Sequence, residues 1–407
     1  MQKQKFVSAL SLAIVAALLL ALSSNVSPAA SAQATMAATE APTLFAPVKV
    51  DVPNTGKITG PADGEAKALT GAGATFPVPL YTKWFSEYEK VTGVKVNYQG
   101  IGSGGGIKGI SDQTLDFGAS DGPMTDDQLK AAKGGAILHI AMTMGGVVPV
   151  YNVPEATTPI KFTPETLALI YLGAAGEEVG ADGKDTVAPL LKWNDDRLVK
   201  DNPELKDVDR NIFVVHRSDG SGTTNIFTSY LSAVNKNWEK NVGAANAVKW
   251  PVGLGGKGNA GVAGNVAQAP YTIGYVELAY AVQNKLQTGM MQNKAGKFLD
   301  ANPETVSAAA AGVKLPADMR VKIVDADGEN AYPISGFTWI LAYAKQTDAA
   351  KATTLTRLLW WGTHDGQQYA ASLGYAPLPL AAIAADEAQI AKITVNGKPA
   401  LPAGIAK

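Results

Sequence analysis

Residues 217–224, of sequence Arg-Ser-Asp-Gly-Ser-Gly-Thr-Thr, are the part of this chain best equipped for chemistry. They combine one cation with several hydroxyl groups and two glycines, and glycine lets backbone N–H groups approach a bound group closely. Ser221 or Thr223 is a suitable N-cap for a following helix, whose positive end favours anions. The run therefore predicts a binding site for an oxyanion.

Individual residues of this run support binding rather than catalysis. Arg217 alone would fit a surface ion pair, but the neighbouring glycines add directed N–H donors to its planar fork and favour a ligand. Asp219, two positions later in an extended segment, is expected to share its face and hold the guanidinium in place. Ser221 does not match the Gly-x-Ser-x-Gly pattern of a nucleophile, because Asp219 precedes it by two positions. His216 nearby does not complete a triad, so no catalytic residue is predicted.

The run lies between an expected strand at 211–215, which is β-branched and apolar, and an expected helix whose apolar residues recur at helical spacing over 226–234. Earlier in the chain the same order repeats, with expected strands at 69–70, 94–99 and 115–119, loops at 71–76, 100–106 and 120–125, and helices over 80–91 and from Ile107. Strands that alternate with helices predict an α/β sheet, whose ligands lie outside the carboxyl ends of its strands.

The glycine-rich loops do not indicate a cofactor. Residues 71–75 alone could form a simple turn capped by Thr75. Residues 100–105 formally fit the dinucleotide pattern Gly-x-Gly-x-x-Gly, but an exported protein has little access to nicotinamide cofactors. In residues 253–258 no Ser or Thr follows Lys257, so this segment is not a phosphate-binding P-loop.

Composition excludes several classes of site. The chain has no cysteine, which rules out disulfides, thiolate metal ligands and a lipid-modified N-terminal cysteine. Its three histidines are far apart in sequence, so neither a metal site nor histidine-based catalysis is predicted. The formal net charge of −1 gives no sign of a nucleic-acid surface, which would need a basic domain or stripe.

The N-terminal residues indicate an export signal. Residues 1–32 contain two early lysines, an apolar stretch and a closing run of small residues, although a retained membrane anchor is the alternative. Residues 33–67 are rich in Ala, Thr, Pro and Gly and are expected to be a flexible tether, with a possible strand at 48–52. The folded part is expected to begin near Ala68, and its length favours two lobes.

Taken together, the loops resemble the phosphate-binding proteins of bacterial phosphate ABC transporters, the PstS family. The resemblance runs in order from about Leu69 to Leu378 and so covers nearly all of the expected folded chain. Its motifs are residues 69–77, 96–103, 116–121, 217–223, 249–259, 273–277 and 332–334.

Carried over position by position, the resemblance implies a set of phosphate ligands. Asp121 would accept the proton of phosphate, and Arg217 would pair with its oxygens. The remaining donors would be Thr75, Phe76, Ser103, Ser221, Gly222 and Thr223, with Asp219 as support. The chain departs from the family where Gly104 replaces a frequent second serine and His216 replaces a frequent basic residue.

The resemblance also implies a two-lobed α/β periplasmic-binding-protein fold, type II-like, with the ligand in the interlobe cleft. One lobe would contain residues 68–142 and 338–407, and the other residues 143–337. The expected protein is a monomeric, non-enzymatic receptor that is exported to the periplasm or the extracellular space. It is expected to deliver inorganic phosphate to membrane permease subunits. The alternatives are a receptor for another tetrahedral oxyanion such as sulfate, or an exported phosphatase.

Overall fold

The computed structural model describes residue 45 and residues 56–176, 178–179 and 186–405. The expected signal segment at 1–32 and the possible strand at 48–52 lie outside these residues. Within the described ranges, no helix combines the length and apolar character needed to cross a bilayer.

A mixed sheet organises the described chain, with strand order β2-β1-β3-β14-β4-β10-β8-β9 and with β11 paired to β4. Its strands are β1 (Ala68–Gly73), β2 (Lys95–Gly100), β3 (Phe117–Ser120), β4 (Ile137–Asn152), β8 (Phe213–Arg217), β9 (Leu254–Gly256), β10 (Thr272–Glu277), β11 (Gln287–Thr288) and β14 (Ser335–Tyr343). The pairs β1–β2, β1–β3, β8–β9 and β8–β10 are parallel, whereas β14 and β10 run antiparallel to β4.

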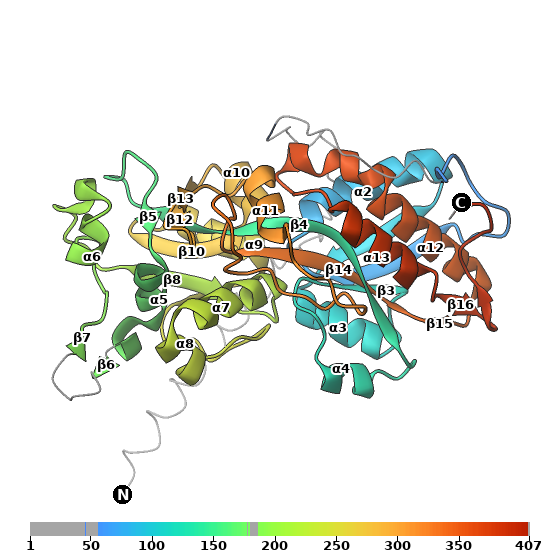
Figure 1. Cartoon of the computed structure of the whole chain (residues 1–407), viewed down its shortest axis with the longest axis horizontal. Helices are drawn as coiled ribbons and strands as arrows, with labels where there is room; N and C mark the ends of the chain where they lie inside the picture. The colour runs from blue at the N-terminus through green and yellow to red at the C-terminus, as the bar shows by residue number, and fades with distance from the viewer. Residues whose placement is uncertain (1–44, 46–55, 177, 180–185, 406–407) are drawn as a thin grey trace, which may run out of the picture. The chain divides into compact units, whose positions relative to one another are not determined.

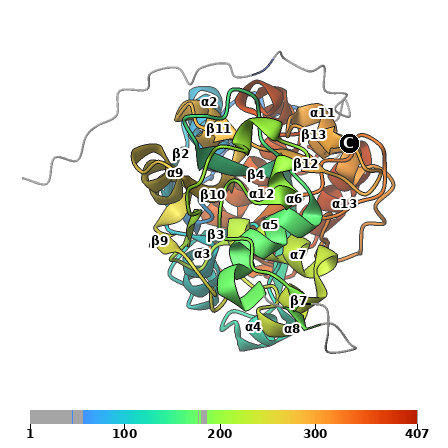
Figure 2. The same ribbon diagram turned by 90° about the vertical axis from the view of Figure 1, so that its left-hand side faces the viewer.

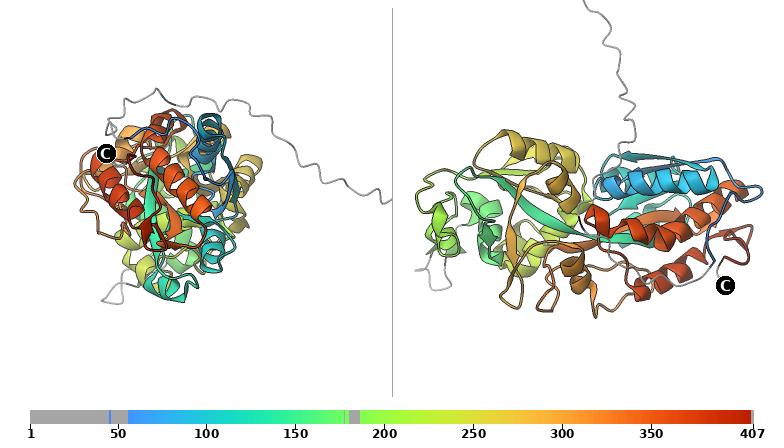
Figure 3. Two further views of the ribbon diagram at one scale, coloured as in Figure 1. Left: turned by 90° about the vertical axis from the view of Figure 1, so that its right-hand side faces the viewer. Right: turned by 90° about the horizontal axis from the view of Figure 1, so that it is seen from above.

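Strand β4 belongs to two sheet regions. Nine of its first ten residues pair with β14, with Met142 skipped at a register shift, and the last of these pairs is Gly146 with Ser335. The next residue, Val147, pairs with Glu277 of β10. We call the side with β1, β2, β3 and β14 region A, and the side with β8, β9 and β10 region B. Seen from above in Figure 3, β4 runs without interruption from one region into the other.

Helices cover both faces of region A (Figure 1). On one face, α2 (Val78–Thr92) packs against α12 (Ala349–Thr363), with the rings of Trp84 and Trp361 in edge contact. On the other face, α3 (Ser103–Ser111) and α13 (Leu380–Ile390) contribute to one buried cluster that also includes Met319, Ile323 and Trp339. The short helix α4 (Asp126–Ala131) starts from a Thr125 capping box.

Region B is likewise covered on two sides. Figure 2 shows α9 (Gly258–Gln268) on one side of β10 and α5 (Pro164–Leu172) and α7 (Gly222–Val234) on the other. Stacking of Phe227 on Tyr275, with ring centroids 4.2 Å apart, fixes α7 against β10. The other elements are α6 (Asp196–Val199), α8 (Lys236–Asn241), α10 (Leu278–Gln283), α11 (Pro303–Ala310), β5 (Lys161–Phe162), β6 (Glu178–Val179), β7 (Thr186–Val187), β12 (Met290–Gln292), β13 (Phe298–Leu299), β15 (Lys345–Gln346), β16 (Thr394–Val395) and β17 (Lys398–Pro399).

The strand–loop–helix order expected from the sequence is confirmed, but several boundaries shift: β1 continues to Gly73, inside the expected loop at 71–76, and β8 covers Phe213–Arg217 instead of 211–215. Helix α3 begins at Ser103, four residues before the expected start at Ile107. Residues 104–106 are glycines, which lower helix propensity and so suggest a loop, but they are helical here. Close packing explains one of these glycines: a Cβ at Gly106 would lie 2.4 Å from the Ala119 carbonyl oxygen and 2.7 Å from the Gly73 Cα. Tertiary contact therefore overrides local propensity.

Residues 56–67, which the sequence places in a flexible tether, pack against α12. The buried Glu65 carboxylate lies 3.0 Å from the Arg357 guanidinium, and the Trp360 indole donates to the Gly56 carbonyl at 3.1 Å. The Thr354 hydroxyl donates to the Ala66 carbonyl at 3.1 Å. The partners of this segment lie nearly 300 residues away in sequence, so composition alone gives no sign of them.

Candidate functional site

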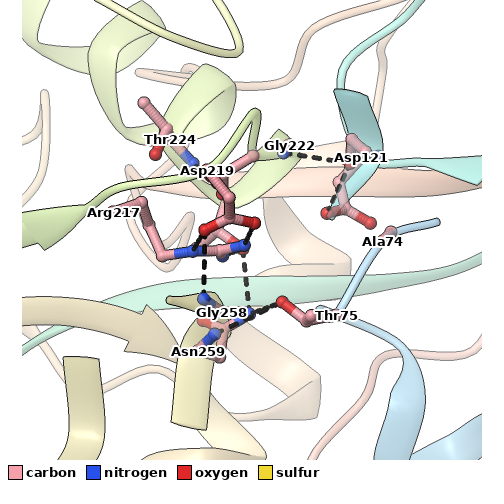
Figure 4. A network of polar contacts seen from close by, with 12 residues as sticks. Ala74, Thr75, Asp121, Arg217, Asp219, Gly222, Thr224, Gly258 and Asn259 are labelled. Atoms are coloured by element: carbon pink, nitrogen blue, oxygen red, sulfur yellow. Dashed lines mark hydrogen bonds and ion pairs between the residues drawn. The ribbon is translucent and has the colours of Figure 1, made fainter. Parts of the chain in front are cut away.

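Four loops that follow the carboxyl ends of β1, β2, β3 and β8 meet between regions A and B (Figure 4). They bring together six polar side chains that the sequence predicts as ligands, and every one of them is buried. These residues are Thr75, Ser103, Asp121, Arg217, Ser221 and Thr223. The structure therefore brings these predicted ligands together at the carboxyl ends of the strands.

Arg217 and Asp219 form a fork-to-fork pair at the end of β8 (Figure 4). Arg217 Nε donates to Asp219 Oδ1 at 2.8 Å and Nη2 donates to Oδ2 at 2.6 Å, while the Gly258 N–H donates to Oδ1 at 3.0 Å. Burial alone raises the Asp219 pKa, but the bonds and charge of Arg217 outweigh it and hold that pKa below its usual value. The expected supporting role of Asp219 matches this geometry. Arg217 Nη1 makes only a long contact of 3.4 Å, to Thr223 Oγ1, and its N–H groups can serve an anion.

Asp121 lies just after β3 and is 2% exposed. Its Oδ1 accepts from the Thr338 hydroxyl at 2.7 Å, and its Oδ2 lies 3.5 Å from the Ser103 hydroxyl. Burial raises the Asp121 pKa to about 7, against the lowering effects of the Thr338 bond, the Arg217 charge and the Ser103 bond. A carboxyl group with such a pKa can accept or donate a proton near neutral pH.

Ser103 joins the two sheet regions. Its hydroxyl oxygen accepts from the Asp121 N–H at 3.2 Å and from the Gly222 N–H at 3.0 Å. Beside it, the Gly104 N–H donates to the Gly220 carbonyl at 2.8 Å, and a Cβ at Gly104 would lie 3.1 Å from the Gly220 Cα. In place of the family's frequent serine, this chain therefore has direct contact between the backbones of two loops.

The start of α7 supplies the next group of contacts. Ser221 is its N-cap, as one of the two predicted candidates, and its hydroxyl oxygen accepts from the Thr224 N–H at 3.0 Å. Thr223 Oγ1 accepts from the Asn259 amide at 3.1 Å, and the same amide donates to Thr75 Oγ1 at 2.9 Å. Asn259 thus bridges a loop of region A and a helix of region B.

The sequence motifs miss several residues that line or brace the site. Asn259 and Glu277 lie inside segments that resemble the family, but neither receives a role from their local pattern. Thr338, Tyr280 and Tyr375 have no local signal, because each reaches the site from a distant part of the chain. The Tyr280 hydroxyl donates to the Thr75 carbonyl at 2.6 Å, and the Tyr375 hydroxyl donates to the Phe76 carbonyl at 2.8 Å.

Hollows in the surface agree only partly with the polar cluster. One of about 320 Å³ opens beside it and is lined by Thr75, Asp219, Gly258 and Tyr280, among others. A larger one of about 810 Å³ lies at the amino end of β8 and is mainly apolar, so it suits no oxyanion. The buried charges, rather than the size of the hollows, identify the site.

None of the three histidines is among the predicted ligands, although His216 Nδ1 lies 2.9 Å from the Arg217 carbonyl oxygen. His139 accepts from the Met124 N–H at 3.0 Å, and burial lowers its pKa to about 4, so it is neutral. His216 stacks on Trp250, and His364 stacks on Trp360. Across the described ranges, no group of three or more His, Asp or Glu side chains is placed to hold a metal ion.

Comparison with known sequences gives close relatives. A family model described as a PBP superfamily domain matches residues 27–355. The phosphate-binding protein PstS of Haemophilus influenzae is 43% identical over 77% of this chain and 90% of that protein. PstS of Methanocaldococcus jannaschii is 37% identical over 75% of this chain and 81% of that protein.

Solved structures share the fold at low sequence identity. A high-affinity periplasmic phosphate-binding protein bound with phosphate superimposes with a TM-score of 0.64 at 19% identity, covering 79% of this chain and 93% of that one. A phosphate-binding protein from Stenotrophomonas maltophilia gives a TM-score of 0.59 at 16% identity, covering 84% and 100%. The expected α/β periplasmic-binding-protein fold is confirmed. With its family model and its relatives in agreement, the chain belongs to the PstS family of phosphate-binding proteins within the PBP superfamily.

Proposed function

We propose that this protein is an exported receptor that captures inorganic phosphate in the cleft between two lobes and delivers it to the permease of an ABC transporter. The observation that carries the proposal is a fixed cation, Arg217, buried beside a carboxyl group, Asp121, whose pKa lies near neutrality. Such a pair suits an anion that still holds a proton. The names of the relatives and of the phosphate-bound structure support the same ligand.

The proposed ligands have complementary roles. Arg217 pairs with phosphate oxygens, and Asp121 accepts the phosphate proton. Donors from the loops and the α7 N-terminus, namely Thr75, Phe76, Ser103, Ser221, Gly222 and Thr223, complete the shell. Each charge-assisted contact contributes about 1.5–3 kcal/mol, and a micromolar dissociation constant corresponds to only about 8 kcal/mol. Several such contacts therefore suffice even after the costs of desolvation and closure.

Calorimetric titration with phosphate, sulfate and arsenate tests the function directly. Phosphate should bind with a dissociation constant in the micromolar range or below, and sulfate should be rejected at about pH 8. Absence of phosphate binding would refute the proposal. A chromogenic phosphate ester in the same buffer should not be hydrolysed, because among the residues that the structure describes no group of side chains placed to hold a metal ion supports the phosphatase alternative. We expect a monomer in solution.

Sulfate rejection should weaken as the pH falls. Sulfate has no proton to share, so ionised Asp121 repels it, whereas protonated Asp121 can donate to it. With a pKa of about 7, the protonated fraction of Asp121 rises from about one-tenth at pH 8 to about nine-tenths at pH 6. Sulfate affinity should therefore increase about ten-fold over this range, measured by calorimetry. A flat profile would show that Asp121 does not control selectivity.

The raised pKa of Asp121 also determines whether the free energy of unfolding rises or falls with pH. Folded Asp121 keeps its proton up to about pH 7, while the unfolded residue loses it near its usual value of about 4. The folded chain thus binds more protons in this window, and the contribution of Asp121 to the free energy of unfolding falls as the pH rises through it. The Asp121→Asn variant should lose this contribution and serve as the control.

Closure of two lobes is the proposed motion. By sequence order one lobe contains residues 68–142 and 338–407 and the other residues 143–337, although Met319 and Ile323 pack with core residues of region A. Because the proposed ligands come from both sides, they can all reach one anion only when the cleft is shut.

Phosphate should therefore make the protein more compact in small-angle scattering and raise its melting temperature. Stabilisation of about 2.7 kcal/mol is expected at a phosphate concentration one hundred times the dissociation constant. Sulfate at about pH 8 is the matched ligand control. A higher melting temperature without compaction would place the whole site within one lobe.

A further inference from the structure

Two tyrosine hydroxyls hold consecutive backbone carbonyls at the start of α2. Tyr280, on α10 of region B, donates to the Thr75 carbonyl at 2.6 Å, and Tyr375, which follows α12, donates to the Phe76 carbonyl at 2.8 Å. Tyr375 and Phe76 are fully buried, and Tyr280 is 9% exposed. The peptide unit between Thr75 and Phe76 is thus held at its own carbonyl, that of Thr75, and at the following carbonyl, that of Phe76.

This arrangement determines the direction of one N–H group. The Thr75 carbonyl and the Phe76 N–H belong to the same trans peptide and point in opposite directions. A bond from Tyr280 to the carbonyl therefore turns the N–H away from Tyr280. Within the described part of the chain, no acceptor takes the Phe76 N–H, and a buried donor of this kind requires a partner.

The proton count at Tyr375 shows how its hydroxyl is oriented. Its oxygen lies 2.8 Å from the Phe76 carbonyl and 3.0 Å from Glu277 Oε2, but it has only one proton. Both partners can accept this proton, and we assign it to the nearer one, the Phe76 carbonyl; Glu277 Oε2 also accepts from the Ala279 N–H at 3.0 Å. Burial raises the Glu277 pKa well above its usual value, against the lowering effects of the Ala279 and Tyr375 bonds.

We propose that Tyr280 and Tyr375 are positioning residues that aim the Phe76 N–H at a bound phosphate oxygen, and that Tyr280 does so only when the two sides of the cleft are in contact. This inference rests on the proposed function. Tyr375 packs edge to face with the Phe76 ring, so its bond is made within region A, whereas the bond of Tyr280 crosses from region B. Tyr375 therefore holds the Phe76 N–H whether or not the cleft is closed. Tyr280 makes the alignment of that N–H depend on closure.

Phenylalanine variants of both tyrosines test the proposal, because each loses one hydroxyl and keeps the ring. Calorimetry should show at least five-fold weaker phosphate binding for Tyr280→Phe and for Tyr375→Phe. Scattering should show reduced phosphate-induced compaction for Tyr280→Phe but not for Tyr375→Phe. Tyr171→Phe is the matched control, since the Tyr171 hydroxyl is buried and has no hydrogen-bond partner among the described residues, and it should bind phosphate as the wild type does.

Amide exchange measured by NMR separates positioning from general destabilisation. With phosphate bound, the Phe76 N–H should exchange at least ten-fold faster in both tyrosine variants than in the wild type. The Ala74 N–H, which donates to the Ala119 carbonyl at 2.9 Å, should be unchanged. If the wild type binds phosphate and both variants match it in affinity and in Phe76 exchange, the positioning role is wrong while the proposed function stands. If the wild type fails to bind phosphate, the proposed function itself is wrong.

Discussion

The Arg217→Lys variant is expected to bind phosphate about ten-fold to one hundred-fold more weakly than the wild type, while remaining folded. Lysine keeps the positive charge but loses the planar fork that pairs with Asp219 on one side and can pair with an anion on the other. The loss of a charged hydrogen bond, about 1.5–3 kcal/mol, sets this range. Calorimetry with phosphate measures the change.

A second arginine provides a matched control for this variant. Arg197 forms the same fork with Asp195, with Nε to Oδ1 at 2.8 Å and Nη2 to Oδ2 at 2.7 Å, but it lies on α6, away from the polar cluster. Arg197→Lys should therefore leave phosphate affinity unchanged. Equal affinities of Arg217→Lys and the wild type would mean that Arg217 serves only its ion pair with Asp219.

The Asp121→Asn variant should bind sulfate at least ten-fold more tightly at about pH 8 than the wild type does, and should retain phosphate. Ionised Asp121 at the centre of an anion site is unfavourable unless a proton lies between the two groups. Asparagine preserves the shape, removes the repelling charge and offers either a donor or an acceptor. Sulfate competition against phosphate, followed by calorimetry, measures the gain.

Asp386 supplies the control for that change. It is also a fully buried aspartate whose pKa burial raises well above its usual value, but it accepts from the Ala141 N–H on the α13 side of region A. Asp386→Asn should alter stability without admitting sulfate. If Asp121→Asn excludes sulfate as strongly as the wild type does, the selectivity arises from other residues.

The sequence alone predicts the parts of the site that depend on neighbours along the chain. Arg217, Asp219 and Ser221 lie within five residues, so the end of a strand, a tight loop and a helix cap could be recognised from residue types and spacing. The strand–loop–helix repeat also placed Ser103 and Asp121 at equivalent ends of their strands. The resemblance to the PstS family then indicated phosphate as the ligand.

Contacts between distant segments could not be predicted in this way. Thr338 reaches Asp121 across 217 positions, and Tyr280 reaches Thr75 across 205 positions. A threonine in a buried strand or a tyrosine in a short helix has no local feature that reports such a partner. The start of α3 was missed for a related reason, because Gly106, one of the glycines that suggest a loop, is required by the close approach of the helix to β1 and β3.

The continuity of β4 limits how the cleft can open. A hinge made of irregular linker would allow a swivel in many directions, whereas β4 is hydrogen-bonded to β14 up to Gly146 and to β10 from Val147 onward. A ladder of this kind resists shear within its plane and yields by bending across the pleat and by a change of twist. The proposed opening of the cleft would therefore have to bend or twist β4 while its pairing on both sides is kept. Under the proposed closure, β4 would act as a flexure that joins region A to region B.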